Sequence, residues 1–212
     1  MRGRLRTIAT CLAAFGCLLS PASAGAADEF EKYDIDSAAA ELSTTQAGAH
    51  PDFTASLLLA EKEGVPYGLT RDVIVALPPG LFGNPGAFPE CSGLEFGTDV
   101  FASACPQDSQ VGAIDVAVGG SISGTFFDSP IYNMPAPGGD VVARFGFYAA
   151  QYPAFINVRL DPETHNLVAA VENSPSGAVL IEAVSTFWGV PADPIHDPER
   201  LTPAEEIGRA HV

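Results

Sequence analysis

Residues 154–160 have the sequence AFINVRL, in which apolar and polar side chains alternate. In an extended chain Ile156, Val158 and Leu160 lie on one face, and Asn157 and Arg159 lie on the other. This period of two is typical of a half-buried antiparallel strand. The stretch therefore predicts a β-sheet with one face against a core.

Further stretches along the chain have the same strand-like pattern. They are DFTASLLLA (52–60), DVIVALPPGL (72–81), QVGAIDVAVGG (110–120), ARFGFYAA (143–150), NLVAAVEN (166–173) and AVLIEAVSTFWGV (178–190). The turn sequences between strands are GNPG (83–86), PAPGGD (135–140), DPETHN (161–166) and NSPSG (173–177). Many short strands separated by turns favour an all-β fold. We expect an antiparallel β-sandwich that is broadly immunoglobulin-like.

Two stretches fit this picture less well. Trp188 lies beyond Cys105, so the Cys…Trp…Cys order of true immunoglobulin domains is absent. The sequence SAAAELS (37–43) is compatible with a short helix, although its small residues give no clear apolar stripe. The sandwich prediction therefore depends on the strand pattern and not on a sequence signature.

The N-terminus is typical of a secretory signal peptide. Three arginines lie in the first six residues, and TIATCLAAFGCLL (7–19) is an apolar run too short to span a bilayer as a mature helix. Small residues follow, so we expect cleavage after Ala24 or Ala26. Residues 1–26 are assigned to the signal peptide, and the protein is expected to be secreted or at the cell surface. A lipoprotein signal that uses Cys17 is a minor alternative.

Removal of the signal peptide makes the chain strongly acidic. Seven basic residues then stand against twenty-six acidic residues, which gives a net charge of −19. Such a chain repels the phosphates of nucleic acids and the heads of anionic lipids, so we expect neither as a partner. No later apolar stretch is long enough to predict a membrane span.

Cys91 and Cys105, in the stretch PECSGLEFGTDVFASACP (89–106), are the cysteines that remain after export. Oxidising conditions outside the cell favour a disulfide between them. A catalytic thiol would need a partner such as His50 or His165, and a metal site would need more ligands close in sequence. We expect the disulfide, closing a surface connection with little core of its own, and leave the other two interpretations open.

The C-terminal end has an unusual sequence. The last seven residues, EIGRAHV (206–212), back-translate to a common sequencing adapter. We expect these residues to be an artefact and the natural chain to continue past Glu205, although a natural C-terminus is the alternative. Residues 27–205 would then be a secreted β-rich region of one or two packed sandwich modules.

The densest group of polar residues is ADPIHDPER (192–200). Three acids in it, Asp193, Asp197 and Glu199, are candidate oxygen ligands for a calcium ion, although the order of an EF-hand loop is missing. His196 next to an acid could act as a general base. The simplest interpretation is a solvated loop in which Asp197 pairs with Arg200 or caps a turn.

Other signals for chemistry are weak. The chain has no G-x-S-x-G nucleophile elbow and no phosphate-binding loop, so no catalytic residue is assigned. Paired carboxylates for glycoside hydrolysis stay possible, because their separation is invisible in a sequence. Aromatic residues that could stack on sugars are Tyr132, Tyr148, Tyr152 and Trp188, but strand positions favour a place in the core.

Several stretches resemble a known group of proteins. They are TTQAGAHPDFT (44–54), RDVIVALPPGLFGNPGAFPEC (71–91), CPQDSQVGAIDV (105–116), ARFGFY (143–148) and FWGVPADPIHDPER (187–200). Together they resemble an uncharacterised group of large secreted or surface-exposed actinobacterial proteins with β-rich, immunoglobulin-like modules. The resemblance implies export and a longer chain. It implies no reaction and no catalytic residues.

The sequence therefore predicts a structural or interaction module of a secreted or cell-surface protein. Its partner would be an unidentified surface or extracellular molecule, and no cofactor is expected apart from the calcium considered above. The alternatives are a carbohydrate- or calcium-binding module and, less favoured, a secreted hydrolase.

Overall fold

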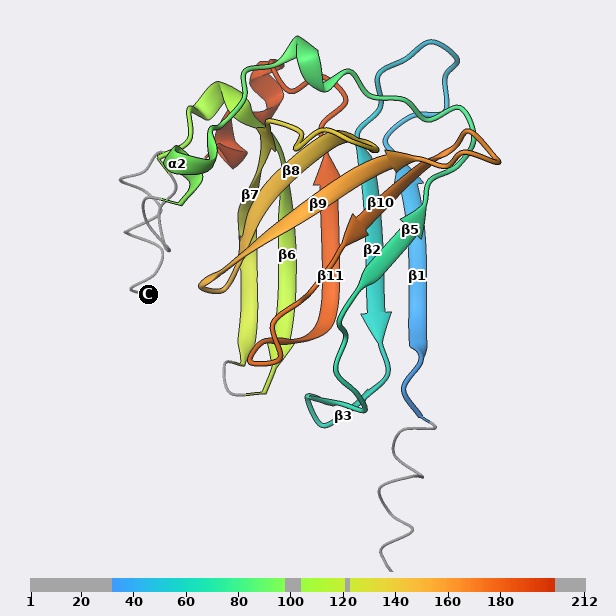
Figure 1. Ribbon diagram of the computed structural model, residues 1–212, viewed down its shortest axis with the longest axis vertical. Helices are drawn as coiled ribbons and strands as arrows, with labels where there is room; N and C mark the ends of the chain where they lie inside the picture. The colour runs from blue at the N-terminus through green and yellow to red at the C-terminus, as the bar shows by residue number, and fades with distance from the viewer. Residues whose placement is uncertain (1–31, 98–103, 121–122, 201–212) are drawn as a thin grey trace, which may run out of the picture.

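The computed structural model describes residues 32–97, 104–120 and 123–200. These residues form one nine-stranded antiparallel sheet and a small two-stranded sheet (Figure 1). The strand order in the large sheet is β1-β2-β11-β6-β7-β8-β9-β10-β5. Its strands are β1 (Ile35–Leu42), β2 (Phe53–Leu59), β5 (Val73–Ala76), β6 (Gln110–Gly119), β7 (Gly124–Met134), β8 (Val141–Ala149), β9 (Tyr152–Leu160), β10 (Leu167–Val171) and β11 (Val179–Phe187).

The remaining elements are short. The small sheet pairs β3 (Glu61–Lys62) with β4 (Val65–Pro66). The helical turns are η1 (Pro85–Ala87), α2 (Gly93–Phe96), η2 (Gln107–Ser109) and η3 (Pro194–Glu199). The prediction of an all-β, antiparallel fold is thus confirmed. Within the described ranges, no helix has the length and apolar character needed to cross a membrane.

The large sheet curls so that one half lies across the other. In Figure 1, β1, β2, β11, β6 and β7 run along the long axis of the molecule, and β8, β9, β10 and β5 cross in front of them. The corner lies in β7, because residues 124–132 pair with β6 whereas only residues 132–134 pair with β8. Asp128 has a left-handed φ of 52° beside a register shift, and its amide donates to Asp115 Oδ1 at 2.7 Å. Such a bulge bends a strand and increases its twist.

The inner face of the curl is apolar. Alternate residues of the strands point inward, and the buried set from β6, β8 and β9 contains Ile114, Val116, Val118, Ala143, Phe147, Ile156 and Val158. Complete burial of one Val, Ile or Phe side chain contributes about 1.5–3 kcal/mol. These side chains therefore hold the two halves of the sheet against each other.

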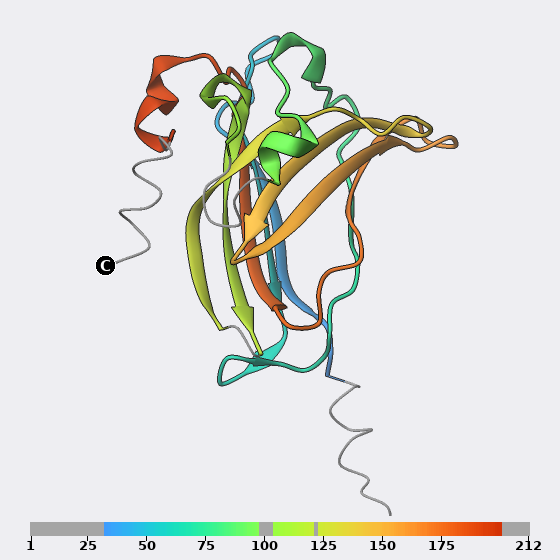
Figure 2. The same cartoon turned by 60° about the vertical axis from the view of Figure 1, so that its left-hand side comes forward.

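A second, smaller core lies on the outside of the sheet. Phe96 of α2 is 2 % exposed and packs with Cys91, Cys105 and the outward side chains of β7, β8 and β9. Its ring stacks on Tyr148 with the centroids 4.8 Å apart. A Cβ at Gly146 would lie 3.0 Å from the Phe96 ring, so glycine in β8 lets α2 approach the strand. Figure 2 shows α2 against the outside of β8.

The structure differs from the sequence predictions in three places. Residues 37–43 are not helical, because most of them belong to β1, which pairs with β2. Strand β7 was not predicted, and β5 is shorter than residues 72–81. The assignments of residues 1–26 and 206–212 lie outside the described residues, and the sandwich and immunoglobulin-like character remains a prediction.

Candidate functional site

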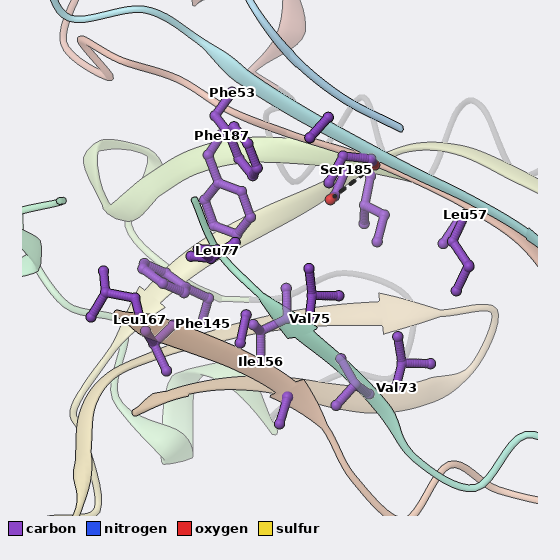
Figure 3. A pocket seen from close by; sticks show the side chains of 18 of the residues that line it. Phe53, Leu57, Val73, Val75, Leu77, Phe145, Ile156, Leu167, Ser185 and Phe187 are labelled. Carbon is purple, nitrogen blue, oxygen red and sulfur yellow. Dashed lines mark hydrogen bonds between the residues drawn. The ribbon is translucent and has the colours of Figure 1, made fainter. Parts of the chain in front are cut away.

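A large cavity lies between the two halves of the curled sheet. Its volume is about 1510 Å³, which exceeds the roughly 300–1,000 Å³ typical of small-molecule pockets. Figure 3 shows side chains from both halves of the sheet pointing into it. The period of two explains the lining from strands such as β11, where the alternate residues Ala183, Ser185 and Phe187 line the cavity.

One wall of the cavity comes from β2 and β11. Phe53 and Leu57 of β2 and Ser185 and Phe187 of β11 point inward (Figure 3). Ser185 does not present an unpaired hydroxyl, since its Oγ donates to the carbonyl of Ala55 at 3.4 Å. This wall is therefore mainly apolar, with hydroxyl groups from Ser185 and Ser56.

The opposite wall comes from β5, β8, β9 and β10. Val73, Val75, Phe145, Ile156 and Leu167 point inward from these strands (Figure 3). Residues paired directly across β5 and β10, such as Val75 and Ala169, share this face. The two walls therefore offer a continuous aliphatic and aromatic lining.

Aromatic contacts bring the two walls together at one end of the cavity. Phe145 and Phe187 pack edge to face with their ring centroids 5.0 Å apart. Asn133 holds the η1 connection near this end, because its Nδ2 donates to the carbonyls of Pro85 and Phe88 at 2.9 and 3.3 Å. Asn133 Oδ1 is enclosed and has no hydrogen-bond partner among the described residues.

The cavity opens between the two edges of the sheet. β1 and β5 are the end strands, so their outer edges are not paired with each other. Residues from both edges line the cavity and are partly exposed, including Leu42 (43 %) and Val75 (41 %). Phe82, 72 % exposed, lines it from the connection after β5. An opening with exposed apolar side chains is typical of a binding site.

The candidate calcium ligands of the sequence lie elsewhere, in and beside η3. Asp193 caps the turn by accepting from the amide of Ile195 at 3.0 Å. Asp197 Oδ1 lies 3.6 Å from Arg200 Nε, and Glu199 Oε2 accepts from Trp188 Nε1 at 3.0 Å. Each carboxylate thus has a protein donor or cation beside it. In the parts of the chain that the structure describes, no group of three or more metal-binding side chains is found, and calcium binding stays a prediction.

His196 is a buried member of the same stretch. It is 6 % exposed, and its ring stacks on Trp188 with the centroids 4.6 Å apart. Its Nε2 lies 3.6 Å from Asp52 Oδ1, and its Nδ1 lies 3.9 Å from Glu199 Oε2. Asp52 also accepts from the amide of Gly189 at 2.8 Å. The contacts join η3 to the ends of β2 and β11, so the prediction of a fully solvated loop is wrong at His196.

The aromatic residues considered for sugar binding do not form an exposed platform. Tyr132 and Trp188 are only 4 % and 5 % exposed, and both lie in packed clusters. Tyr148 is half-buried against Phe96 and donates to its carbonyl at 2.7 Å. Tyr152 is half-buried and lines the cavity. Their strand positions indicated a core role, and the structure places them accordingly.

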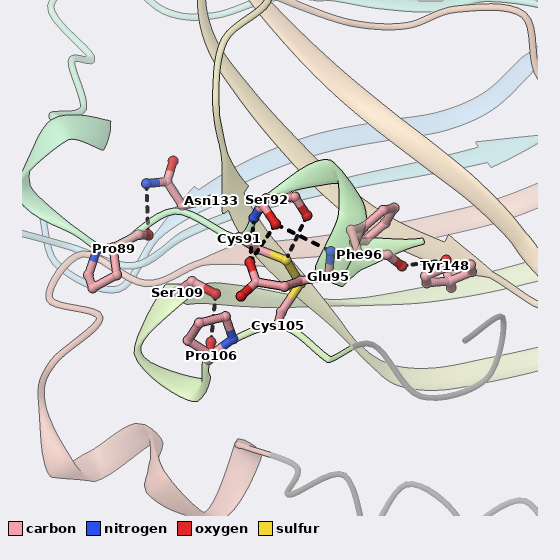
Figure 4. The surroundings of a disulfide bond; sticks show 10 residues. All are labelled: Pro89, Cys91, Ser92, Glu95, Phe96, Cys105, Pro106, Ser109, Asn133 and Tyr148. Atoms are coloured by element: carbon pink, nitrogen blue, oxygen red, sulfur yellow. Dashed lines mark hydrogen bonds between the residues drawn. A yellow bond between two sulfur atoms is a disulfide. The ribbon is translucent and has the colours of Figure 1, made fainter. Parts of the chain in front are cut away.

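Cys91 and Cys105 form a disulfide in the structure, with their Cα atoms 5.1 Å apart (Figure 4). That separation meets the geometric requirement for a bridge. Both residues are buried, at 0 % and 6 % exposure, and they pack against Phe96. The prediction that this connection has little core of its own is therefore wrong. His50 and His165, considered as partners for a free thiol, are both exposed.

The cavity could not be recognised from the amino-acid sequence. The alternation showed which side chains face inward, but it gave no sign that the two inner faces would enclose a cavity beside their packed core. The clearest available signal was the excess of apolar residues in segment 53–59, which forms β2 next to the edge strand β1, and in segment 73–76, which forms the edge strand β5. Comparison with known protein families, curated protein sequences and solved structures finds no match for this chain.

Proposed function

We propose that this chain is a ligand-binding interaction module of an exported protein, and that an elongated apolar molecule binds in the cavity. The observation that carries the proposal is a cavity of about 1510 Å³ lined by apolar side chains from both halves of the sheet. A large apolar pocket is the usual location of a small-molecule site. Its volume has room for a long alkyl chain.

The energetics of burial support the same conclusion. An apolar ligand that enters the cavity removes its own surface and that of the lining from water, at about 25 cal/mol per Å² of apolar area. Binding by an alkyl chain is therefore the event that this lining favours.

Export is part of the proposal. The arginines and apolar run near the N-terminus are typical of a signal peptide, and the Cys91–Cys105 disulfide suits an oxidising compartment. A secreted or surface-located module would meet its ligand and its partner outside the cell. This interpretation retains the interaction module that the sequence predicts and adds a ligand class to it.

We also propose that the architecture is a sandwich in the broad, immunoglobulin-like sense. The curl lays β8, β9, β10 and β5 across the other half of the sheet, with apolar side chains between the two layers. A sheet that turns a corner within one strand can supply both layers. Strand β7 is the strand that turns the corner here, because it pairs with β6 in one layer and with β8 in the other.

Binding is favoured over catalysis by the surroundings of the one buried histidine of the described chain. His196 has Trp188 against its ring face and the carboxylates of Asp52 and Glu199 near its two nitrogens. None of these neighbours offers the hydroxyl or thiol that a histidine base activates in covalent catalysis. The arrangement is better suited to holding η3 in place.

The test is binding of N-phenyl-1-naphthylamine, an uncharged apolar dye that fluoresces in apolar sites. The protein should bind the dye, and Ala183→Phe should weaken binding at least about tenfold, equivalent to 1.4 kcal/mol. Ala183 lies on the inner face of β11, where a phenyl group would occupy the cavity. The matched control is Ala117→Phe on the neighbouring strand β6, where Ala117 does not line the cavity and pairs with exposed Glu182.

A second variant guards against a folding defect in Ala183→Phe. Val75→Trp changes a side chain at the opening that is already 41 % exposed, so the fold has room for it. It should also weaken dye binding, while circular dichroism stays that of the wild type. Dye affinity equal in all four proteins, or absent from the wild type, would refute the proposed function.

A further inference from the structure

At one end of the opening, the charged side chains that line the cavity are all acidic. The acidic residues that line the cavity are Asp34, Asp72 and Glu172, and the wall as described contains no lysine or arginine. The other charged or titratable group of note is His50, which lies beside Gly189 at the far end of β1 and β2. We name Asp34, Asp72 and Glu172 the acidic rim.

Hydrogen bonds show that the segments carrying the three acids of the acidic rim lie next to one another. Tyr33 Oη and Thr70 Oγ1 are 2.8 Å apart, which ties the residue before Asp34 to the segment that leads to Asp72. Asp72 Oδ1 accepts from the amide of Asn173 at 2.9 Å, and Asn173 follows Glu172 directly. The acidic rim therefore stands where β1 and β5 begin and β10 ends.

The basic residues near the acidic rim already have partners and do not line the cavity. Arg159 lies 2.9 Å from Glu172 and 3.1 Å from Asp140, and the hydrogen bond to Glu172 is the main cause that raises its pKa. Arg71 donates to Asn173 Oδ1 at 3.1 Å and lies 3.9 Å from Asp72. Lys32 stands over the ring of Tyr67 at 5.7 Å. An anionic group at the opening would have to take a cation from one of these contacts.

We propose that the cavity holds a long-chain amphiphile with its head group at the acidic rim, and that this head group carries no negative charge. The inference rests on the proposed function, since it adds the chemistry of the head to an apolar chain in the cavity. The carboxylates of the rim repel a carboxylate, sulfate or phosphate head, and the net charge of −16 over the whole sequence adds to this repulsion. A hydroxyl head can instead donate a hydrogen bond to a rim carboxylate.

The experiment compares two ligands of equal chain length as competitors of the bound dye. The ligands are 1-dodecanol and dodecanoate at about pH 8, where a carboxylic acid with an ordinary pKa of about 4–5 is ionised. Dodecanoate should bind at least about tenfold more weakly than dodecanol at low ionic strength. The difference should shrink in about 1 M salt, where the Debye length is about 3 Å, because the rim carboxylates are exposed to solvent.

Alcohols partition more readily than carboxylates into any apolar site, so charge variants are needed. The variant Asp34→Asn removes the rim carboxylate that has no arginine partner among the described residues, so it frees no cation at the opening. The ratio of the two dissociation constants should then fall at least about twofold. The control variant Glu182→Gln makes the same change in net charge at an exposed residue outside the cavity lining, and it should keep the wild-type ratio.

The outcomes separate the two claims. Failure of both ligands to displace the dye would refute the proposed function, and this inference with it. Displacement by both with equal affinity would overturn the inference and leave the proposed function standing. A ratio that changes equally in the rim and control variants would also overturn it, because the selection would then come from net charge and not from the rim.

Discussion

At the residue scale, single polar groups fix the segments that cover the sheet. Ser92 begins α2 with a capping box, in which its Oγ accepts from the amide of Glu95 at 3.3 Å and its own amide donates to Glu95 Oε2 at 2.9 Å. In the segment that contains η3, His196 holds the turn in place through its contacts with Trp188 and Asp52. A capping box satisfies backbone donors that a helix of four residues cannot satisfy itself.

The first prediction concerns Glu95. The side-chain hydrogen bond from Ser92, followed by the backbone hydrogen bond from Ser92, lowers the pKa of Glu95 below its ordinary value of 4.5. Since the folded pKa is lowered, the stabilisation from this carboxylate is complete above about pH 4.5 and is lost as the pH falls through the folded value. Ser92→Ala should raise the pKa of Glu95 in a carboxyl ¹³C NMR titration.

Unchanged titration of Glu95 in Ser92→Ala would show that the capping box does not form in solution. The assignment of α2 as a capped turn would then be wrong, and the packing of Phe96 would need another explanation.

At the element scale, the sequence predicted strands where alternation is regular and failed where it is interrupted. β9 was predicted well, because Ile156 and Val158 alternate with polar residues. For β1 the sequence left a short helix open, because its small alanines carry little information about which face is buried, and all of its residues are exposed. β7 was missed because Asp128, with its left-handed φ, and Pro130 interrupt the strand at the corner.

The second prediction concerns the disulfide between Cys91 and Cys105, which closes the segment that contains α2. Replacing both Cys91 and Cys105 by Ser should lower the free energy of unfolding by about 2–4 kcal/mol, because the cross-link limits the unfolded chain. The β-rich circular dichroism should not change, since the two cysteines lie outside every strand. Denaturant unfolding gives the energy, and limited proteolysis should cut first within residues 92–104.

Two outcomes would contradict this prediction. Two thiols that titrate with Ellman's reagent in the folded, exported wild type would show that the bridge does not form. An unfolding free energy unaltered by the double substitution would show that the bridge does not stabilise the fold.

At the scale of the whole molecule, the cavity depends on the path of a single continuous sheet. The alternation of each strand was enough to predict that the fold is antiparallel and all-β. It was not enough to predict that β7 bends, which decides whether β5 and β10 lie beside β2 or face it across a cavity. Such a long-range property depends on a bulge at Asp128 and on pairing between segments far apart in the sequence. The apolar site could therefore not be located before the structure, and neither could the acidic rim.

Methyl NMR on the folded protein tests the central claim most directly. With increasing 1-dodecanol, the methyl signals of the cavity wall should shift together and saturate, with Leu57, Val75, Ile156 and Leu167 as reporters from four strands. Val65, Leu94 and Ile195 are 66 %, 84 % and 72 % exposed and do not line the cavity, so their signals should stay in place. Shifts confined to these exposed methyls, or a wall that does not respond at saturating dodecanol, would contradict the account of an apolar ligand inside the curled sheet.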